Sequence, residues 1–342
     1  MSQDFSQFEQ RKQDHIRLAL DAENQASEWN RLDDVFLSHE AIPDLDFDAI
    51  DLSTKRFNEI VSVPFMVSSM TAGHLGAVNI NQRLMAACQT TGWAMGVGSQ
   101  RRELNDKGAS EEWVRLVKAY PDVALYSNLG IAQLITADIS DIHRLMDAIH
   151  AKAIIIHCNA LQECIQPEGT PQFKGAWQAL ETLVLALDKP VIVKETGCGF
   201  GLSSLKRLND IGVKAVDVSG LGGTHWGRLE GQRALGDETR KRTAETFKHW
   251  GITTVDAVKM AKSLSPNYEI WGSGGVRHGL DAAKLLALGA STIGFAKPLL
   301  EAALVSDEAV IALMKTIAYE LKVALFCTGS STLQALEEKL CL

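Results

Sequence analysis

The sequence lacks several features that would place it in a specialised class of protein. Its six cysteines show no C-x-x-C spacing, which disfavours both a disulfide framework and a cysteine-bound zinc site. No apolar run approaches the roughly 18 residues of a membrane span, and the N-terminus MSQDFSQFEQRKQDH has no apolar segment of the signal-peptide kind. The net charge of −8 argues against general affinity for nucleic acid. We therefore expect a soluble, cytoplasmic protein with neither a membrane nor a nucleic-acid partner.

What the chain does have is 342 residues with 46% hydrophobic content, enough for one large core. Short apolar runs alternate with helical periodicity, and eight of these runs are strand candidates. They lie near residues 63–69, 93–98, 123–129, 153–159, 190–196, 215–220, 268–273 and 291–296. Such continuous apolar runs are typical of parallel strands covered by helices. We predict an α/β fold, a (β/α)8 TIM barrel. The competing doubly wound sheet is disfavoured because no G-x-G-x-x-G follows the first strand.

Two regions fall outside the β/α repeat. Residues 1–60 precede the first strand, and residues 222–252 form a long polar connection after the sixth. Connections of that length in a compact domain are usually functional lids or partly disordered segments. We predict a single domain, residues 1–342, in which residues 1–60 are an N-terminal extension and residues 222–252 are a lid loop.

Two glycine-rich segments, GSGGV at 272–276 and GFAKP at 294–298, each end an apolar run late in the chain. Backbone N–H groups reach phosphate oxygens only where no Cβ intervenes, and a helix N-terminus adds partial positive charge there. In β/α barrels the loops after the last two strands often bind phosphate, and Arg277 and Lys297 add cations here. These segments predict a clamp for a phosphorylated cofactor. The alternative is two ordinary strand-to-helix turns.

Polar residues follow six successive strand candidates, where the active sites of β/α barrels lie. Side chains alternate along a strand, so His157 and Asn159 share one face of the fourth candidate and Cys158 takes the other. We therefore expect Cys158 to face the helix layer as a small apolar filler and discount it as a nucleophile.

The fifth candidate ends in KETGCG, where Lys194 and Thr196 share a face. A lysine inside the barrel mouth needs an anionic partner. That partner is either a cofactor or, in the plainer interpretation, the carboxylate of Glu195 or Asp217.

Two further segments carry candidate ligands. Glu163, surrounded by amide side chains, is a weak protein site for Mg²⁺, which commonly shares its oxygen ligands with substrate phosphates. The plainer alternative is a solvated loop carboxylate. RKQDHI places Arg11, Lys12 and His15 within one helical turn, where they either close over a diphosphate or form a solvated basic turn, and Arg101 adds charge at the barrel mouth.

These motifs in this order resemble the type 2 isopentenyl-diphosphate Δ-isomerases, which are FMN-dependent enzymes of isoprenoid synthesis. The resemblance runs from RKQDHI to AKPLL, nearly the whole chain, and rests on RKQDHI, GSQR, HCNALQE with QPEG, DVSGLGGTHW and SGGVR. The GGV loop alone is shared with other FMN barrels such as 2-hydroxy-acid oxidases. The order of all the motifs is what makes the resemblance specific.

The resemblance implies site residues, position by position. Positions that match FMN contacts are Ser69, Met70, Thr71, Ser99, Asn128, Lys194, Ser219, Thr224, Gly274, Gly275, Val276, Arg277, Ala296 and Lys297. Positions that match the substrate pocket and its cover are Arg11, Lys12, His15, Ser99, Gln100, Arg101, His157, Asn159, Gln162, Trp226 and Glu230. Gln162 matches the glutamine beside the allylic carbon and is the candidate catalytic residue, and Glu163 matches the Mg²⁺ ligand.

Three positions depart from the family's usual pattern. Ala72 stands where a glycine is usual, Thr170 where an aspartate is usual, and Lys297 where an arginine is common. The first two affect loop packing, whereas Lys297 keeps the charge and loses the bidentate geometry of a guanidinium.

The implied function is the interconversion of isopentenyl diphosphate and dimethylallyl diphosphate, by acid/base proton transfer on reduced FMN with no net redox change. The implied cofactors are FMN, Mg²⁺ and NADPH as flavin reductant, and the implied assembly is a tetramer or octamer of identical chains. One alternative is an FMN-dependent 2-hydroxy-acid oxidase or dehydrogenase. The other is a non-catalytic flavin-binding protein.

Overall fold

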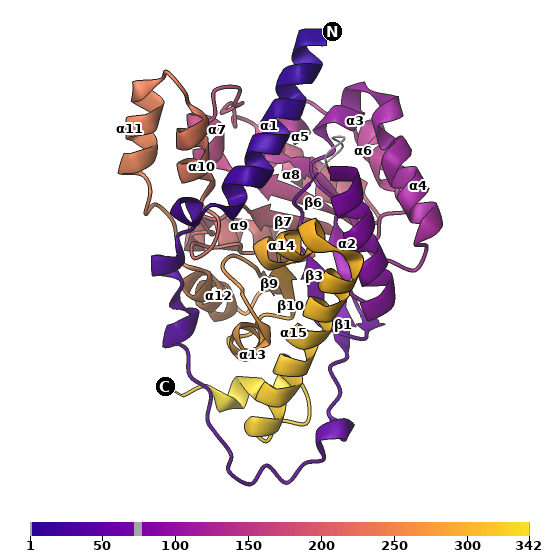
Figure 1. Ribbon diagram of the computed structural model, residues 1–342, viewed down its shortest axis with the longest axis vertical. Helices are drawn as coiled ribbons and strands as arrows, with labels where there is room; N and C mark the ends of the chain where they lie inside the picture. The colour runs from indigo at the N-terminus through magenta and orange to yellow at the C-terminus, as the bar shows by residue number, and fades with distance from the viewer. Residues whose placement is uncertain (1, 72–76, 342) are drawn as a thin grey trace.

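The computed structural model describes residues 2–71 and 77–341, and it contains a closed parallel barrel (Figure 1). The strands follow one another around the barrel in chain order from β3 to β10, and β10 pairs with β3 to close it. They are β3 (Phe65–Val67), β4 (Ala94–Gly96), β5 (Leu125–Gly130), β6 (Ala153–Cys158), β7 (Val191–Glu195), β8 (Ala215–Asp217), β9 (Glu269–Gly272) and β10 (Thr292–Phe295). Seven lie inside a predicted run and β5 extends one residue beyond its run, so the (β/α)8 prediction is confirmed.

Alternating side chains on the strands supply two separate cores. On β6, Ile154 and Ile156 pack in the layer between barrel and helices, whereas Ala153 and Ile155 point into the barrel interior. His157 continues the interior column at the carboxyl end of the strand. The two-residue period of a strand therefore lets one run supply core packing along its length and a cavity residue at its carboxyl end.

Helices cover the outside of the barrel (Figure 1). They are α2 (Val78–Thr91), α3 (Arg101–Asn105), α4 (Glu111–Ala119), α5 (Ile131–Leu134), α6 (Ile139–Ala148), α7 (Ala160–Ile165), α8 (Ala176–Ala186), α9 (Leu202–Ile211), α12 (Thr254–Ser263), α13 (Gly279–Ala287), α14 (Lys297–Val305) and α15 (Asp307–Cys327). Local sequence sets several of their ends. Thr253 caps α12 and Ser306 caps α15 with side-chain oxygens, and Gly92 ends α2 in the left-handed region at φ 74°.

The N-terminal extension touches both ends of the barrel. Helix α1 (Ser2–Leu20) crosses the mouth, and short 3-10 turns follow, including η3 (Arg31–Asp34). The hairpin β1 (Thr54–Arg56) and β2 (Glu59–Val61), which the sequence did not predict, closes the floor. Buried Arg56 there donates to the Phe65 carbonyl at 3.2 Å and to the Tyr126 hydroxyl at 3.3 Å. The floor is thereby sealed with an internally satisfied guanidinium.

The connection after β8 contains two helices, α10 (Trp226–Arg233) and α11 (Glu238–Thr246), and not one continuous loop (Figure 1). His225 and Asp237 cap their N-termini with side-chain acceptors. The helices pack closely, because a Cβ added at Gly231 would collide with Ala244. The charge density that suggested a loop belongs partly to the solvated face of α11, as in Glu238 with Lys241, and partly to a buried ion pair on α10, Arg233 with Glu230.

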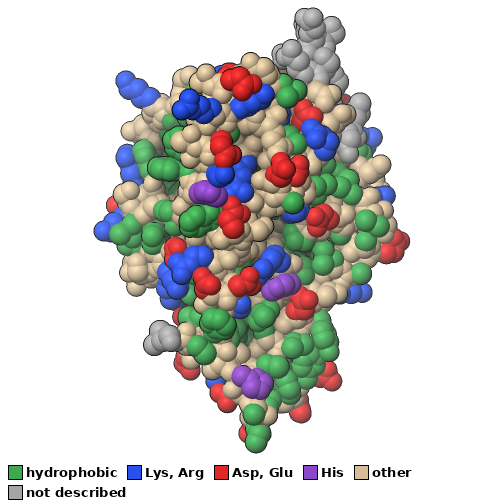
Figure 2. Space-filling view, turned by 60° about the vertical axis from the view of Figure 1, so that its left-hand side comes forward, with side chains coloured by type: hydrophobic (Ala, Val, Ile, Leu, Met, Phe, Trp, Pro, Cys, Tyr) green, Lys and Arg blue, Asp and Glu red, His purple; other side chains and the backbone are tan. Residues whose placement is uncertain are grey.

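The face in Figure 2 carries acidic and basic side chains lying beside one another, with hydrophobic side chains gathered at its lower end. Exposed ion pairs on the protein surface include Arg31 with Asp34 and Lys262 with Glu337. Across the described ranges, no helix is both long enough and apolar enough to cross a membrane. Of the departures noted above, Ala72 lies outside the described residues.

Candidate active site

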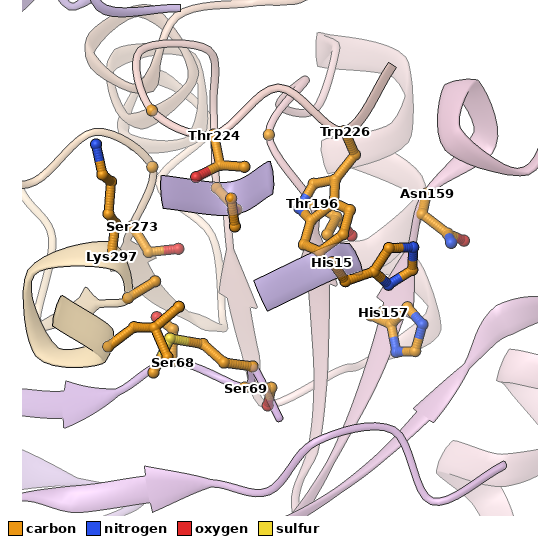
Figure 3. Close-up of a pocket in the computed structure, with 18 of the residues that line it drawn as sticks. His15, Ser68, Ser69, His157, Asn159, Thr196, Thr224, Trp226, Ser273 and Lys297 are labelled. Atoms are coloured by element: carbon orange, nitrogen blue, oxygen red, sulfur yellow. The ribbon is translucent and has the colours of Figure 1, made fainter. Parts of the chain in front are cut away.

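A cavity of about 640 Å³ opens at the carboxyl ends of the barrel strands. Its walls come from helix α1, the strand ends, α10 and the two glycine-rich segments. Figure 3 shows Lys297 and Ser273 on one side, His157 and Asn159 on the other, and His15 beside Trp226. Except for Gln100 and Glu230, every residue carried over from the family lines this cavity.

The side chain of Gln100 does not line the cavity, so its assignment to the substrate pocket stays a prediction. It is fully buried, and its Oε1 accepts hydrogen bonds from the Ser127 hydroxyl and from the backbone N–H of Asn128 at 3.2 Å. The amide of Gln100 therefore holds the end of β5, while Ser99 and Arg101 on either side line the cavity.

Backbone atoms dominate the wall formed by the glycine-rich segments. Gly274 and Gly275 have φ values of 97° and 77°, which other residues rarely adopt. Among the described residues, the N–H groups of Gly275 and Val276 carry no hydrogen bond. Across the cavity wall, Lys297 begins α14, whose N-terminal amides add partial positive charge. A phosphate binds to backbone N–H groups that have no other partner and that no Cβ obstructs. This wall offers such groups, so it fits the phosphate of FMN.

Arg277, expected beside that phosphate, is bound to two carboxylates. Its guanidinium lies 2.6 Å from Asp33 Oδ1 and 2.8 Å from Asp281 Oδ2. Hydrogen bonds to Asp281 and Asp33 raise the pKa of Arg277. The side chain is therefore already neutralised, whereas Lys297 has, within the part of the chain that the structure describes, only Glu301 within ion-pair range, at 3.7 Å.

Lys194 stands at the carboxyl end of β7, on the face that the strand parity predicted. Its Nζ donates to the Glu195 carbonyl at 2.7 Å and to the Ser219 hydroxyl at 2.9 Å, and it lies 4.0 Å from Asp217 Oδ2. Burial raises the pKa of Asp217, and Lys194 opposes that rise. The buried ion pair and the cavity-facing position therefore coexist, because the ammonium group lines the cavity as well.

His157 enters the cavity as a neutral side chain. Asn128 Nδ2 donates to the Val97 carbonyl at 3.1 Å, which turns Asn128 Oδ1 toward His157 Nδ1 at 2.9 Å. Nδ1 must then carry the proton. Burial, followed by the charges of Lys194 and Lys12, lowers the pKa of His157 to about 3. Cys158 packs with the helix-layer core, as the parity predicted.

Gln162 belongs to a hydrogen-bond network centred on Glu230. Glu230 is fully buried and does not itself line the cavity, so its assignment to the substrate pocket and its cover stays a prediction. Its Oε1 accepts from Gln162 Nε2 at 3.0 Å and lies 2.9 Å from His15 Nε2, and its Oε2 accepts from Arg233 at 2.5 Å. Burial raises the pKa of Glu230, but His15, Arg233 and Gln162 outweigh it and hold the pKa below its ordinary value. Gln162 Oε1 accepts from Asn159 at 3.1 Å, so both ends of its amide are fixed.

Glu163 lines the cavity next to Gln162 and is nearly buried. Its oxygens accept from Asn159 Nδ2 at 2.9 Å and from the backbone N–H of Thr170. The second bond involves the main chain, so the threonine at position 170 does not disturb it. No cluster of three or more metal-ligating side chains occurs among the described residues. Glu163 therefore fits Mg²⁺ only if substrate oxygens and water complete the coordination.

Helix α1 brings Arg11, Lys12 and His15 over the opening. Burial lowers the pKa of Lys12 to about 8, with Arg11 as the next contributor. His15 packs edge-on against Trp226, with ring centroids 5.1 Å apart. The three side chains thus share the cavity with residues more than 200 positions away.

Several lining residues were not predicted. They are Ser68, Ser273, Gln133, Gln166 and, from the N-terminal extension, Gln25, Ser27 and Asn30. Ser68 and Ser273 follow strand candidates and share a face with other assigned residues, so strand parity could have found them. The residues of the extension offer no local signal, because they reach the cavity through contacts with distant loops.

Comparison with known proteins gives a consistent picture. Residues 138–342 match the family model described as FMN-dependent dehydrogenase. An isopentenyl-diphosphate delta-isomerase from Legionella pneumophila (strain Lens) is 63% identical, covering 100% of both chains. The one from Bdellovibrio bacteriovorus is 50% identical over 99% of each.

Solved structures of similar fold include a mandelate oxidase variant and a flavocytochrome b2 variant. The first has a TM-score of 0.66 at 18% identity and covers 96% of this chain and 94% of its own. The second has a TM-score of 0.68 at 18% identity and covers 94% of this chain and 80% of its own. At these identities the likeness concerns the fold. On the full-length sequence matches, the chain belongs to the isopentenyl-diphosphate delta-isomerase family, built on the barrel of the FMN-dependent dehydrogenases.

Proposed function

We propose that this chain interconverts isopentenyl diphosphate and dimethylallyl diphosphate with reduced FMN as the bound cofactor. The observation that carries the proposal is the division of one cavity into two unlike walls. One wall offers unpaired backbone amides for a phosphomonoester, and the other offers Arg11, Lys12 and Arg101 beside the single carboxylate Glu163. A cofactor phosphate and a substrate diphosphate can therefore be held at opposite ends of the same space.

The substrate's alkene is unactivated, so moving its double bond requires a strong acid at one carbon and a base two carbons away. Of the titratable side chains that line the cavity, His157 is neutral. The ammonium group of Lys194 donates hydrogen bonds to Ser219 and to the Glu195 carbonyl. Neither is placed as a proton donor to an alkene. When bound, reduced FMN supplies an acid and base pair and an electron-rich ring face next to the developing cation.

The protein's own contribution is positional. Arg11, Lys12 and Arg101 neutralise the diphosphate, and Glu163 holds Mg²⁺ against its oxygens. Binding energy at this remote, unreactive end fixes the alkene at the reacting centre. Gln162 lies beside this centre. Hydrogen bonds anchor both ends of its amide, so the amide presents one fixed orientation to the proton that is transferred.

The finer parts of the proposal are Mg²⁺ at Glu163, NADPH as the source of reducing equivalents, a cytoplasmic location, and a homo-oligomer, tetramer or octamer. The α10–α11 pair is proposed as a cover, since Trp226 on α10 contacts His15 on α1. The domain assignment is a single domain, residues 1–342.

The deciding experiment is an anaerobic conversion assay with isopentenyl diphosphate, in which FMN, NADPH and Mg²⁺ are omitted in turn. We expect dimethylallyl diphosphate to form without stoichiometric NADPH consumption, and to be lost without flavin or Mg²⁺. Net oxidation of a 2-hydroxy acid without isomerisation would instead place the chain among the flavin oxidases.

Gln162→Ala tests the catalytic assignment. We expect turnover to fall by about 100-fold or more, in the range typical of general acid–base contributions, while FMN affinity stays unchanged. An unaltered rate would remove Gln162 from the mechanism. Glu163→Gln is the companion variant, and full retention of Mg²⁺ dependence in it would contradict the metal assignment.

A further inference from the structure

The turn at Gly274–Val276 owes its shape to two side chains outside it. Thr254 Oγ1, at the start of α12, donates to the Gly274 carbonyl at 2.7 Å. Asn30 Nδ2, from the N-terminal extension, donates to the Gly275 carbonyl at 2.6 Å. Two consecutive carbonyls of the turn are therefore fixed by donors from two elements that are far apart in the sequence.

Because peptide groups are planar, these two contacts also fix the directions of two N–H groups. In a trans peptide the carbonyl of one residue and the N–H of the next point in opposite directions. Fixing the Gly274 carbonyl thus fixes the N–H of Gly275, and fixing the Gly275 carbonyl fixes the N–H of Val276. Neither of these two amides carries a hydrogen bond within the described residues.

The backbone around the turn is closely packed, so the turn has little room to change its conformation. A Cβ on Gly275 would lie 2.5 Å from the Gly222 carbonyl oxygen and 2.9 Å from Asn30 Nδ2. A Cβ on Gly223 would lie 2.6 Å from the nitrogen of Gly275. Three chain segments, at residue 30, residues 222–223 and residues 274–275, are stacked at glycine spacing.

We propose that Asn30 and Thr254 are positioning residues that aim the N–H groups of Gly275 and Val276 at the phosphomonoester of the flavin cofactor. The inference rests on the proposed cofactor and goes beyond it, because it assigns part of phosphate recognition to the N-terminal extension. The side chain of Arg277 is occupied by Asp33 and Asp281, so oriented amides carry the recognition that a free arginine would otherwise provide.

The test uses the phosphate itself as the variable. Riboflavin is FMN without its phosphate, so the ratio of the two dissociation constants, measured by quenching of flavin fluorescence, isolates phosphate recognition. Asn30→Ser keeps a side-chain oxygen able to accept from the Leu32 N–H, as Asn30 does at 3.1 Å, but is too short to reach Gly275. Thr254→Val keeps the branched shape and removes the hydroxyl.

We expect each variant to weaken FMN binding by about tenfold, because one charge-assisted hydrogen bond to the phosphate is weakened when its N–H group is no longer held in place. Riboflavin binding should stay unchanged. Asn24→Ser is the matched control in the same extension. Asn24 bonds the Leu18 carbonyl and Gln232, each at 3.0 Å, and does not contact the phosphate turn. It should leave the FMN-to-riboflavin ratio at the wild-type value.

Equal loss of FMN and riboflavin in Asn30→Ser and Thr254→Val would show a merely structural role and overturn the proposal, as would no loss of either. If Asn30→Ser fails to fold, as judged by circular dichroism, Thr254→Val decides the matter alone. A wild-type protein that binds neither flavin would refute the proposed cofactor and with it this inference. Wild-type isomerase activity with an unchanged ratio in both variants would overturn this inference only.

Discussion

The two walls of the cavity recognise anions in different ways. The wall at Gly274–Val276 and the start of α14 is made mainly of main-chain amides, and its arginine is already neutralised. The opposite wall is made of side chains, with His15 and Gln162 both bonded to the single oxygen Glu230 Oε1. An amide wall is rigid and insensitive to pH, whereas a wall of ionisable side chains depends on their protonation and on each other's presence. Such a division suits a resident cofactor on one side and an exchanging substrate on the other.

The largest effect should come from adding a single methyl group to the amide wall. In Gly274→Ala the new Cβ would collide with the Gly220 carbonyl and lie 2.8 Å from the Gly220 nitrogen, at a φ of 97°. We expect loss of about 2–4 kcal/mol of unfolding free energy and at least a 100-fold loss of FMN affinity, measured by urea unfolding and fluorescence titration.

Gly236→Ala is the matched control. Gly236 has a φ of 80° with nothing within 4 Å of an added Cβ, so only the conformational cost of about 1 kcal/mol should appear, with no change in FMN affinity. Equal effects of the two substitutions would mean that the close contact with Gly220 is not what makes glycine necessary at position 274.

Removing the buried charge behind the side-chain wall should give the next largest effect. Glu230→Gln keeps the shape but loses the carboxylate that His15, Gln162 and Arg233 share. We expect turnover to fall by about 100-fold while FMN affinity stays at the wild-type value, since the amide wall is untouched. Glu238→Gln, at an exposed ion pair with Lys241, is the control and should leave both unchanged. A parallel loss of FMN affinity in Glu230→Gln would show that the two walls are not independent.

The sequence predicted the amide wall more fully than the side-chain wall. Gly274 and Gly275 are recognisable because a local glycine pair at the end of an apolar run has few other uses, and strand parity placed His157 and Lys194 correctly. Glu230 was recognised through the family resemblance, but its burial away from the cavity depends on α10 being a helix, which the polar composition of residues 222–252 concealed. Asn30 could not be predicted, because its partner Gly275 is 245 residues away. Long-range contacts of this kind leave no local periodicity to detect.

The pH dependence of substrate binding should follow the side-chain wall. Burial lowers the pKa of Lys12 from its ordinary value of 10.5 to about 8, so the side chain is mainly charged below that pH and mainly neutral above it. Its attraction for a diphosphate is therefore complete below pH 8 and is lost as the pH rises through 8. We expect KM to rise about tenfold between roughly pH 7.5 and 9.5, given one titrating group in contact with the anion.

Lys12→Arg sharpens this prediction, because a guanidinium stays protonated over the whole range. In that variant the rise in KM should disappear. If it persists, a group other than Lys12 controls binding in this pH range. FMN affinity, measured in parallel, should stay flat with pH in both proteins, because the amides of the other wall do not titrate.

The smallest effects should separate the two cations next to the phosphate turn. Lys297 is half-buried and has one ion-pair partner among the described residues, Glu301 at 3.7 Å, so Lys297→Gln should weaken FMN binding by about tenfold and leave stability within about 0.5 kcal/mol. Arg277→Gln should do the reverse. It leaves Asp281, fully buried, without its cation, which costs about 1–3 kcal/mol of unfolding free energy, while FMN affinity changes by no more than about threefold. Fluorescence titration and thermal unfolding of both variants check the pair. A large loss of FMN affinity in Arg277→Gln would mean that its guanidinium leaves Asp33 and Asp281 for the phosphate, and the amide wall would then be a charged wall like its neighbour.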